Sequence, residues 1–150
     1  MEKVKIKSAL IASVRSKLLE TIALLEATIA DTQQQANDYG PPKDRYDSFR
    51  TQLMRRRDLL AQQLSKEMNE LQVIDKLESM KNLDHAAFGA VVLTQDQNYF
   101  LSIGLGKLEV DSTTYFAESP IVPISQALLG KKKNETFEFR GKKTEILDVF

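Results

Sequence analysis

Apolar residues in the first part of the chain recur at the heptad spacing of a coiled coil. Between residues 8 and 37 they follow one another at steps of three and four: Ile11, Val14, Leu18, Ile22, Leu25 and Ile29. This spacing places them on one narrow stripe of a helix, with the charged residues off the stripe. Beyond Ile29 the chain becomes polar, so we expect the apolar seam to weaken toward the end of this helix.

A second heptad run of similar length spans residues 44–77. Its apolar positions are Tyr46, Phe49, Leu53, Leu60, Leu64, Met68, Leu71 and Ile74. Between the runs lie Pro41 and Pro42, which end a helix because proline lacks the backbone donor and clashes with the preceding turn. The pattern therefore predicts an antiparallel coiled-coil hairpin over residues 1–77. A parallel dimer of one long helix is the competing interpretation, and a plain spacer or dimerisation hairpin also stays open.

The period changes after residue 77, and short alternating or β-branched runs predict a small sheet. We place a linker at residues 78–84 and a second domain at residues 85–150. Pro123 to Leu129 is predicted to be a short helix, with proline in its first turn and Gly130 after its end. The expected fold class is α+β, with a strongly bent sheet and one helix packed on it. The strand candidates are residues 86–93, 99–103, 107–110, 113–116, 136–139 and 144–150.

Composition narrows the classes of function. The 21 basic and 21 acidic residues balance, so no global field favours nucleic acid or an anionic membrane. Cysteine is absent and there is a single histidine, which argues against thiolate and histidine-built metal sites. No apolar run approaches the ~20 residues of a membrane span. We expect a cytoplasmic monomer without an intrinsic cofactor or a membrane contact.

Three C-terminal segments carry a resemblance to a known family. Residues 123–131, 135–139 and 145–150 resemble the C-terminal domain of the Gre transcript-cleavage factors, in which a Ser-Pro-x-x-x-Ala-Leu-(Leu/Ile)-Gly-Lys helix precedes two strands. Residues 71–75 resemble the end of the family's coiled coil. The order of arm and body is similar along the whole chain. The resemblance implies an FK506-binding-protein-like domain behind a coiled-coil arm.

The resemblance also implies a partner and candidate site residues. Such factors dock their body on bacterial RNA polymerase and insert the arm into its secondary channel. There, two acids at the tip share a Mg²⁺ ion with the polymerase during cleavage of backtracked RNA. The docking candidates here are Leu128, Leu129, Gly130 and Lys131, and the basic patch expected to face the RNA is Arg50, Arg55, Arg56 and Arg57. A solvated helix face paired with acids on the first helix is the alternative for the basic patch.

The acidic tip departs from the family pattern Asp-x-x-Glu-Asn-x-x-Tyr. With Tyr46 aligned to the family tyrosine, Tyr39 stands at the aspartate position and Pro42 at the glutamate position. The nearby acids are Asp38, Asp44 and Asp47, of which Asp38 and Asp44 are candidates for a weak Mg²⁺ site shared with the polymerase. Helix capping is the alternative role for these acids, and we place Asp44 and Asp47 at the start of the second helix.

The sequence therefore favours a Gre-like regulator of transcription elongation, not itself an enzyme, that occupies the channel without efficient cleavage. Two alternatives remain. One is a true cleavage factor with a rearranged acidic tip, and the other is a non-transcriptional protein whose coiled coil pairs with itself or with another helix.

Overall fold

The computed structural model describes residues 2–77 and 82–150, and the chain divides into two compact units. One unit comprises Met1–Arg15 and Val73–Phe150, and the other comprises Ser16–Gln72. The expected linker at residues 78–84 lies partly outside the described residues. The fold class is α+β, as expected: two long helices precede a six-stranded sheet that carries one short helix.

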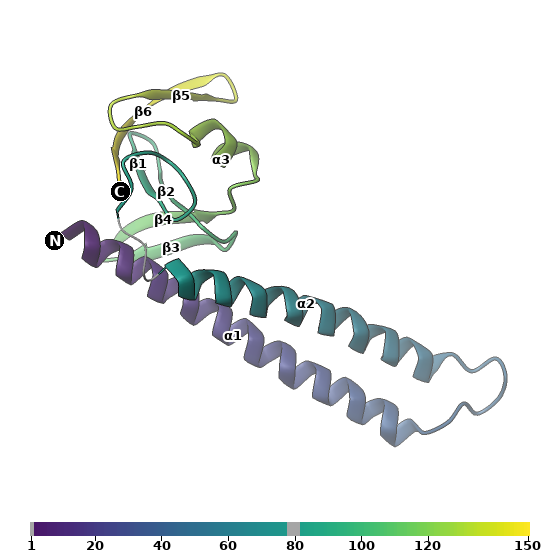
Figure 1. Cartoon of the computed structure of the whole chain (residues 1–150). Helices are drawn as coiled ribbons and strands as arrows, with labels where there is room; N and C mark the ends of the chain where they lie inside the picture. Colours follow the sequence, from purple (N-terminus) through teal and green to yellow (C-terminus); the bar gives the residue numbers. More distant parts are fainter. Residues whose placement is uncertain (1, 78–81) are drawn as a thin grey trace. The chain divides into compact units, whose positions relative to one another are not determined.

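Two long helices form the arm, α1 (Glu2–Tyr39) and α2 (Phe49–Leu77), and they run antiparallel (Figure 1). Arg15 Nε bonds Asp75 Oδ1 at 2.9 Å, and Arg57 Nη1 donates to Gln33 Oε1 at 2.6 Å. The two contacts lie eighteen residues apart along each helix, so the register of the two helices is the same at both contacts. At ~1.5 Å per residue the 38 residues of α1 extend over about 57 Å.

The seam of α1 is the predicted stripe, and it continues further than expected. Ile11, Val14, Leu18, Ile22 and Leu25 are buried. Where the sequence becomes polar, the small side chains of Thr32 and Ala36 keep the same heptad spacing and are also buried. The Thr32 hydroxyl donates to the carbonyl of Thr28 at 2.8 Å, which satisfies its polar atom inside the helix.

The expected seam of α2 needs correction. The helix begins at Phe49 and not at residue 44, so Tyr46 is not helical, and both Tyr46 and Phe49 are exposed. Met68 is exposed too, because the heptad step between Leu64 and Leu71 passes through Glu67, which is partly covered. Leu53 and Ile74 are buried as predicted. Leu60, Leu64 and Leu71 are half-buried.

The strands of the body follow the predicted order closely. The sheet order is β3-β4-β2-β1-β6-β5, and its pairs are antiparallel except β2 with β4, which is parallel. A register shift between Leu93 and Thr94 interrupts the pairing of β1 with β6. The strands are β1 (Val91–Thr94), β2 (Asn98–Leu101), β3 (Gly106–Val110), β4 (Thr113–Glu118), β5 (Thr136–Phe139) and β6 (Lys142–Val149).

The short helix α3 (Pro123–Leu128) packs against the apolar core of the sheet. Gly130 follows it with φ +83°, a left-handed conformation that glycine adopts without strain. The Gly130 amide donates to the carbonyl of Ala86 at 2.7 Å, and the Ala86 amide donates to the carbonyl of Lys131 at 2.8 Å. These bonds tie the segment before β1 to the end of α3. The first residues of the predicted strand 86–93 are held this way instead of in the sheet.

Candidate functional site

The tip loop, residues 40–48, joins the two helices of the arm, and one carboxylate organises it. Asp47 Oδ2 accepts a hydrogen bond from the Tyr39 hydroxyl and another from the Lys43 amide at 2.8 Å. Its other oxygen, Oδ1, accepts from the amide of Phe49 at 3.1 Å. Asp47 therefore closes the loop from both sides and caps the first turn of α2.

The electrostatics of this contact follow from its hydrogen bonds. The bond from the Lys43 amide, followed by that from the Tyr39 hydroxyl, lowers the pKa of Asp47 below its ordinary value. The bond to Asp47 is the main cause that raises the pKa of Tyr39. The pair therefore holds one ionised carboxylate against one protonated phenol at neutral pH.

Aromatic packing supports the same junction. The rings of Tyr39 and Phe49 lie with centroids 4.7 Å apart, and the ammonium group of Lys43 lies 4.9 Å from the centroid of Tyr39. Gly40, with φ +78°, ends α1, and its amide donates to the carbonyl of Ala36 at 3.1 Å. The reversal of the chain between α1 and α2 is therefore stabilised by contacts among aromatic and charged side chains.

The other two candidate acids also engage the chain itself. Asp44 Oδ1 accepts from the amide of Tyr46 at 2.7 Å, a local turn that lies before α2 and not on it as expected. Asp38 Oδ1 accepts from the side-chain amide of Gln34 one turn earlier in α1, at 2.8 Å. The Mg²⁺ role expected for Asp38 and Asp44 stays a prediction. Within residues 2–77 and 82–150, no group of three or more His, Cys, Asp or Glu could hold a metal ion.

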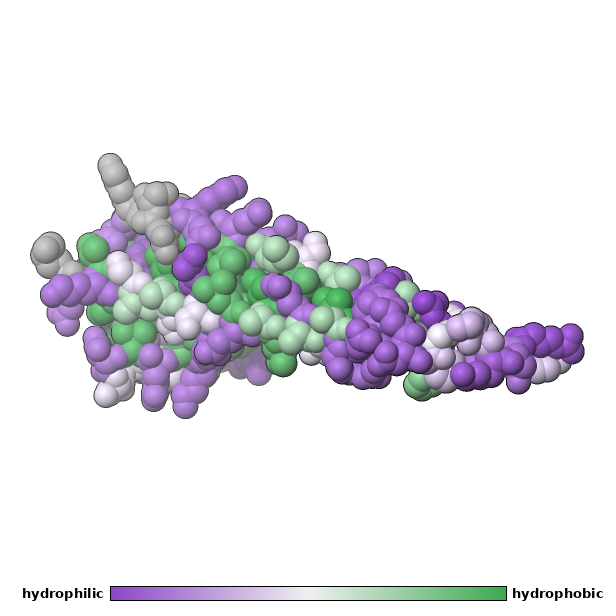
Figure 2. Space-filling view, turned by 90° about the horizontal axis from the view of Figure 1, so that it is seen from below, coloured by the Kyte–Doolittle hydropathy of each residue, from purple (hydrophilic) through white to green (hydrophobic). Residues whose placement is uncertain are grey.

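The basic patch divides between two environments. Arg57 lies at a heptad position of α2 and is partly covered, bonded to Gln33 across the seam and to Asp58 beside it. Arg55 and Arg56 are exposed, and Arg50 is half-exposed. The patch expected to face RNA therefore retains Arg50, Arg55 and Arg56 as accessible cations. Figure 2 shows the far end of the arm covered mainly by hydrophilic residues on this face.

Of the docking candidates on the body, Leu128 is fully buried in the core, together with Phe137 and Ile146. Its side chain stabilises the fold and offers no surface to a partner. Leu129 is half-buried against the same core, whereas Gly130 is exposed and Lys131 partly exposed. Docking through Gly130 and Lys131 stays a prediction.

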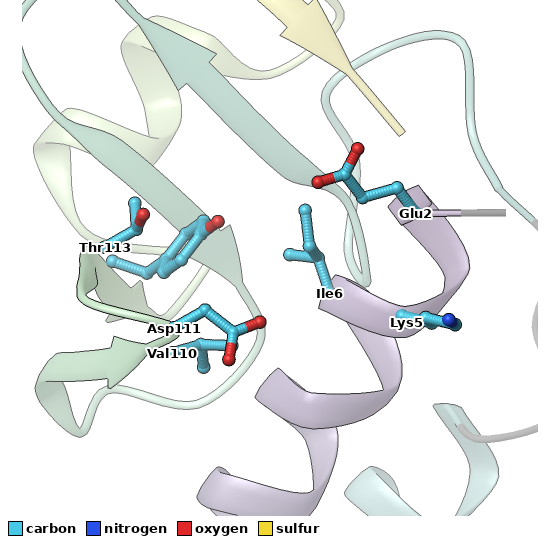
Figure 3. Close-up of a pocket in the computed structure, with 7 residues that line it drawn as sticks. Glu2, Lys5, Ile6, Val110, Asp111 and Thr113 are labelled. Carbon is cyan, nitrogen blue, oxygen red and sulfur yellow. The ribbon is translucent and has the colours of Figure 1, made fainter.

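Several hollows lie in the unit that contains the sheet. A cavity of about 590 Å³ has Glu2, Lys5 and Ile6 on one side and the β3–β4 turn on the other. Figure 3 shows Ile6 and the carboxylate of Asp111 pointing into it, whereas Lys5 points away. A smaller hollow of about 270 Å³ is lined partly by Ile124 of α3 and by Phe137 and Phe139 of β5.

The sequence singled out the tip acids but missed the junction that they build. Tyr39 and Asp47 stand eight residues apart in the sequence, and this spacing alone does not predict a hydrogen bond between them. The available signal was Asp47 two residues before an aromatic residue that could start a helix, which is the pattern of a capping residue.

Comparisons with known proteins do not identify a family for this chain. No protein-family model and no curated protein matches it. One solved structure that it matches is the GreA factor homolog 1 (Gfh1) protein of Thermus thermophilus, with 12% identity and a TM-score of 0.34 over 92% of this chain and 95% of that chain. A TM-score this low does not establish a common fold, so the fold class rests on the chain's own elements. None of the described helices is long and apolar enough to cross a membrane.

Proposed function

We propose that this chain is a Gre-like regulator that binds bacterial RNA polymerase and places its helical arm in the secondary channel without efficient stimulation of cleavage. The C-terminal sequence resemblance and the helical hairpin ahead of a small sheet support the class of protein. The observation that carries the proposal is the state of the tip. Its three candidate acids, Asp38, Asp44 and Asp47, each accept hydrogen bonds from the arm's own groups.

A tip whose carboxylates already accept hydrogen bonds from the arm's own groups is poorly suited to hold a catalytic metal ion. Mg²⁺ requires near-octahedral oxygen ligands and gives up its water reluctantly. Asp47 has both oxygens engaged by three donors, and Pro42 stands at the spacing of the family glutamate. The arm would therefore occupy the channel and exclude true cleavage factors.

The absence of cysteine allows a direct test of where the tip lies. A Ser48→Cys variant carries a single thiol in the tip loop, and Ser65→Cys carries one on an exposed part of α2. Each variant is coupled to a photo-activated crosslinker and mixed with polymerase halted on a template. The proposal predicts crosslinks from position 48 to residues lining the active centre or to the RNA 3′ end, and crosslinks from position 65 nearer the channel entrance. Crosslinks from neither position would refute it.

One observation favours a second candidate function, a coiled coil that associates with another helix. Leu24 and Leu59 are 68% and 67% exposed on the arm, so both side chains are available to the apolar face of a partner helix. Sedimentation at several concentrations tests this function. A dimer that dissociates on Leu24→Gln or Leu59→Gln substitution would support it, whereas a concentration-independent monomer would remove it.

A further inference from the structure

The cavity of about 590 Å³ lies between the first turns of α1 and the β3–β4 hairpin. Both of its walls belong to the same compact unit, which comprises Met1–Arg15 and Val73–Phe150. The ion pair of Lys3 with Asp148, at 2.8 Å, joins the first turn of α1 to β6. A volume of this size is in the range of small-molecule sites. The cavity is therefore a formed feature of one unit of the fold.

Two carboxylates without a partner face this cavity from its two walls. Glu2 extends from the start of α1 toward the strands, and Asp111 extends from the β3–β4 turn toward the helix (Figure 3). Neither carboxylate forms an ion pair or a hydrogen bond with another described residue. Lys5, a cation that also lines the cavity, points away from it. The cavity therefore offers a negative charge on each side.

Tyr115 adds a buried hydroxyl to the same cavity. The residue is 4% exposed and lines the cavity, and its hydroxyl has no hydrogen-bond partner among the described residues. Burial raises the pKa of Tyr115, and the negative charges of Asp111 and Glu2 raise it further. Both carboxylates therefore act on this hydroxyl, which stays protonated at neutral pH. A buried hydroxyl without a partner is costly, and a ligand atom that bonds it would remove that cost.

The hairpin turn defines the place of Asp111. The strands β3 and β4 pair as far as Val110 and Thr113, so the turn consists of Asp111 and Ser112 alone. Both residues have positive φ, 50° and 65°, as in the two-residue turns that match the twist of a hairpin. Asparagine adopts this conformation as readily as aspartate, so the charge at this position can be removed without changing the turn.

We propose that this cavity binds an aliphatic diamine, with one ammonium group paired to Glu2 and the other to Asp111. The methylene chain lies on the apolar groups that line the cavity, the side chains of Ile6 and Val110. One ammonium group also donates to the hydroxyl oxygen of Tyr115. Hydrogen bonds between ammonium and carboxylate groups are stronger than neutral ones, and the apolar contact favours a ligand with methylenes over a hydrated metal ion.

This inference goes beyond the proposed function and does not rest on it. The cavity lies in the unit that contains the sheet, whereas the proposed function rests on the tip loop of the arm. A ligand held by both walls would also stabilise this unit, because it binds only the folded chain. Binding is therefore measurable on the full chain without polymerase.

The test is an NMR titration of the full chain with diaminobutane at low salt and neutral pH, where exposed charges are least screened. The amide resonances of Asp111, Ser112 and Thr113 are expected to shift and to saturate. Butylamine, which carries one ammonium group and can pair with only one carboxylate, is expected to bind about threefold more weakly.

Substitutions that keep the shape of the cavity identify the groups that bind. Asp111→Asn and Glu2→Gln are each expected to weaken binding about threefold, and the double variant about tenfold. Tyr115→Phe, which removes only the hydroxyl, is expected to weaken it about threefold. Glu109→Gln removes an exposed charge from β3 outside the cavity, so it is the matched control and should change the affinity less than about 1.5-fold.

Two results would overturn the inference. One is equal affinity for diaminobutane in the wild type and in the double variant Glu2→Gln/Asp111→Asn, with circular dichroism verifying that both are folded. The other is a set of shifts of the same size and midpoint with Mg²⁺ in place of diaminobutane, because this would show attraction of any dication without a site for the diamine. Saturable shifts that the double variant loses would support it.

Discussion

The hydroxyl of Tyr39, the last residue of α1, donates a hydrogen bond to the carboxylate of Asp47, two residues before α2. Because that carboxylate also accepts the amides of Lys43 and Phe49, one side chain joins the end of the first helix, the loop and the start of the second. The shape of the tip surface, and with it the position of Tyr46, depends on this junction.

Substitution of Asp47 is expected to loosen the tip without unfolding the chain. Asp47→Ala leaves three donors without their acceptor and removes the cap of α2. We expect faster amide exchange at Lys43 and Phe49, measured by NMR, and little change at the base of the arm. Asp38→Ala is the matched control, because Asp38 accepts from Gln34 within α1. Equal exchange rates in both variants would contradict the role given to Asp47.

The same junction should respond to pH in opposite directions at its two members. The pKa of Asp47 is lowered, so its contribution to tip order is present above the ordinary value of 3.8 and is lost as pH falls through the lowered pKa. The pKa of Tyr39 is raised above 10.0, so its contribution persists below that value and is lost as pH rises through the raised pKa. NMR titration of the Tyr39 ring measures this, and Asp47→Asn should return the pKa of Tyr39 toward 10.0. An unchanged titration would show that the bond does not form.

A lysine at the start of α1 is expected to cost stability. Lys7 is 5% exposed, and its ammonium nitrogen has no hydrogen-bond partner among the described residues. Burial lowers its pKa, so the cost is full below the lowered pKa and disappears as pH rises past the unfolded value near 10.5. Lys7→Met should raise the free energy of unfolding by about 1–3 kcal/mol at neutral pH, as measured by urea denaturation. Lys5→Met, at an exposed position, is the control, and a gain that did not shrink above pH 10.5 would point to packing alone.

The polar contact across the seam of the arm is expected to favour one register at some cost in stability. Arg57 lies at a heptad position of α2, where an apolar residue would pack, and bonds Gln33, which lies beside the seam of α1. The double variant Gln33→Leu/Arg57→Leu should stabilise the arm by about 1 kcal/mol and broaden its register. Thermal unfolding measures the first effect, and Arg56→Leu, on the exposed face, should show neither. A destabilised double variant would mean that the polar pair contributes net stability.

The body should lose stability at Leu128 and tolerate change at Ile121. Leu128 is fully buried between α3 and the sheet, so Leu128→Ala is expected to cost about 2–5 kcal/mol. Ile121 is 82% exposed, and Ile121→Ala should lie within about 0.5 kcal/mol of wild type. Urea denaturation compares the two variants. A cost at Leu128 near zero would place this residue on a surface and return it to the docking candidates.

The periodicity of apolar residues was sufficient to predict an element where one physical cause determines its structure. The stripe from Ile11 to Leu25 is buried as predicted, because heptad spacing leaves a helix no other way to cover its apolar side. The strand at residues 136–139 also matches, since the alternation of apolar and polar residues acts locally. Short-range signals of this kind predicted most of the elements.

Competing local forces explain the misses. The apolar residues Tyr46 and Phe49 fitted a helical pattern, but hydrogen bonds to Asp44 and Asp47 hold the chain in a loop up to residue 48. Glu67, and not Met68, occupies the heptad position between Leu64 and Leu71. The spacing of the seam therefore decides which residue is covered, although methionine is the more hydrophobic of the two. At the site, the acids were visible in the sequence, but their bonding to the loop itself depends on the fold of the tip.

A transcript-cleavage assay on backtracked elongation complexes tests the central claim, that an arm with internally bonded acids occupies the channel without efficient cleavage. The chain is added alone and then in competition with a true Gre factor, in the presence of Mg²⁺. The account predicts little shortening of the RNA by the chain alone and inhibition of the true factor as its concentration rises. Rapid Mg²⁺-dependent shortening by the chain alone, abolished by Asp38→Ala or Asp44→Ala, would contradict it and establish a working acidic tip.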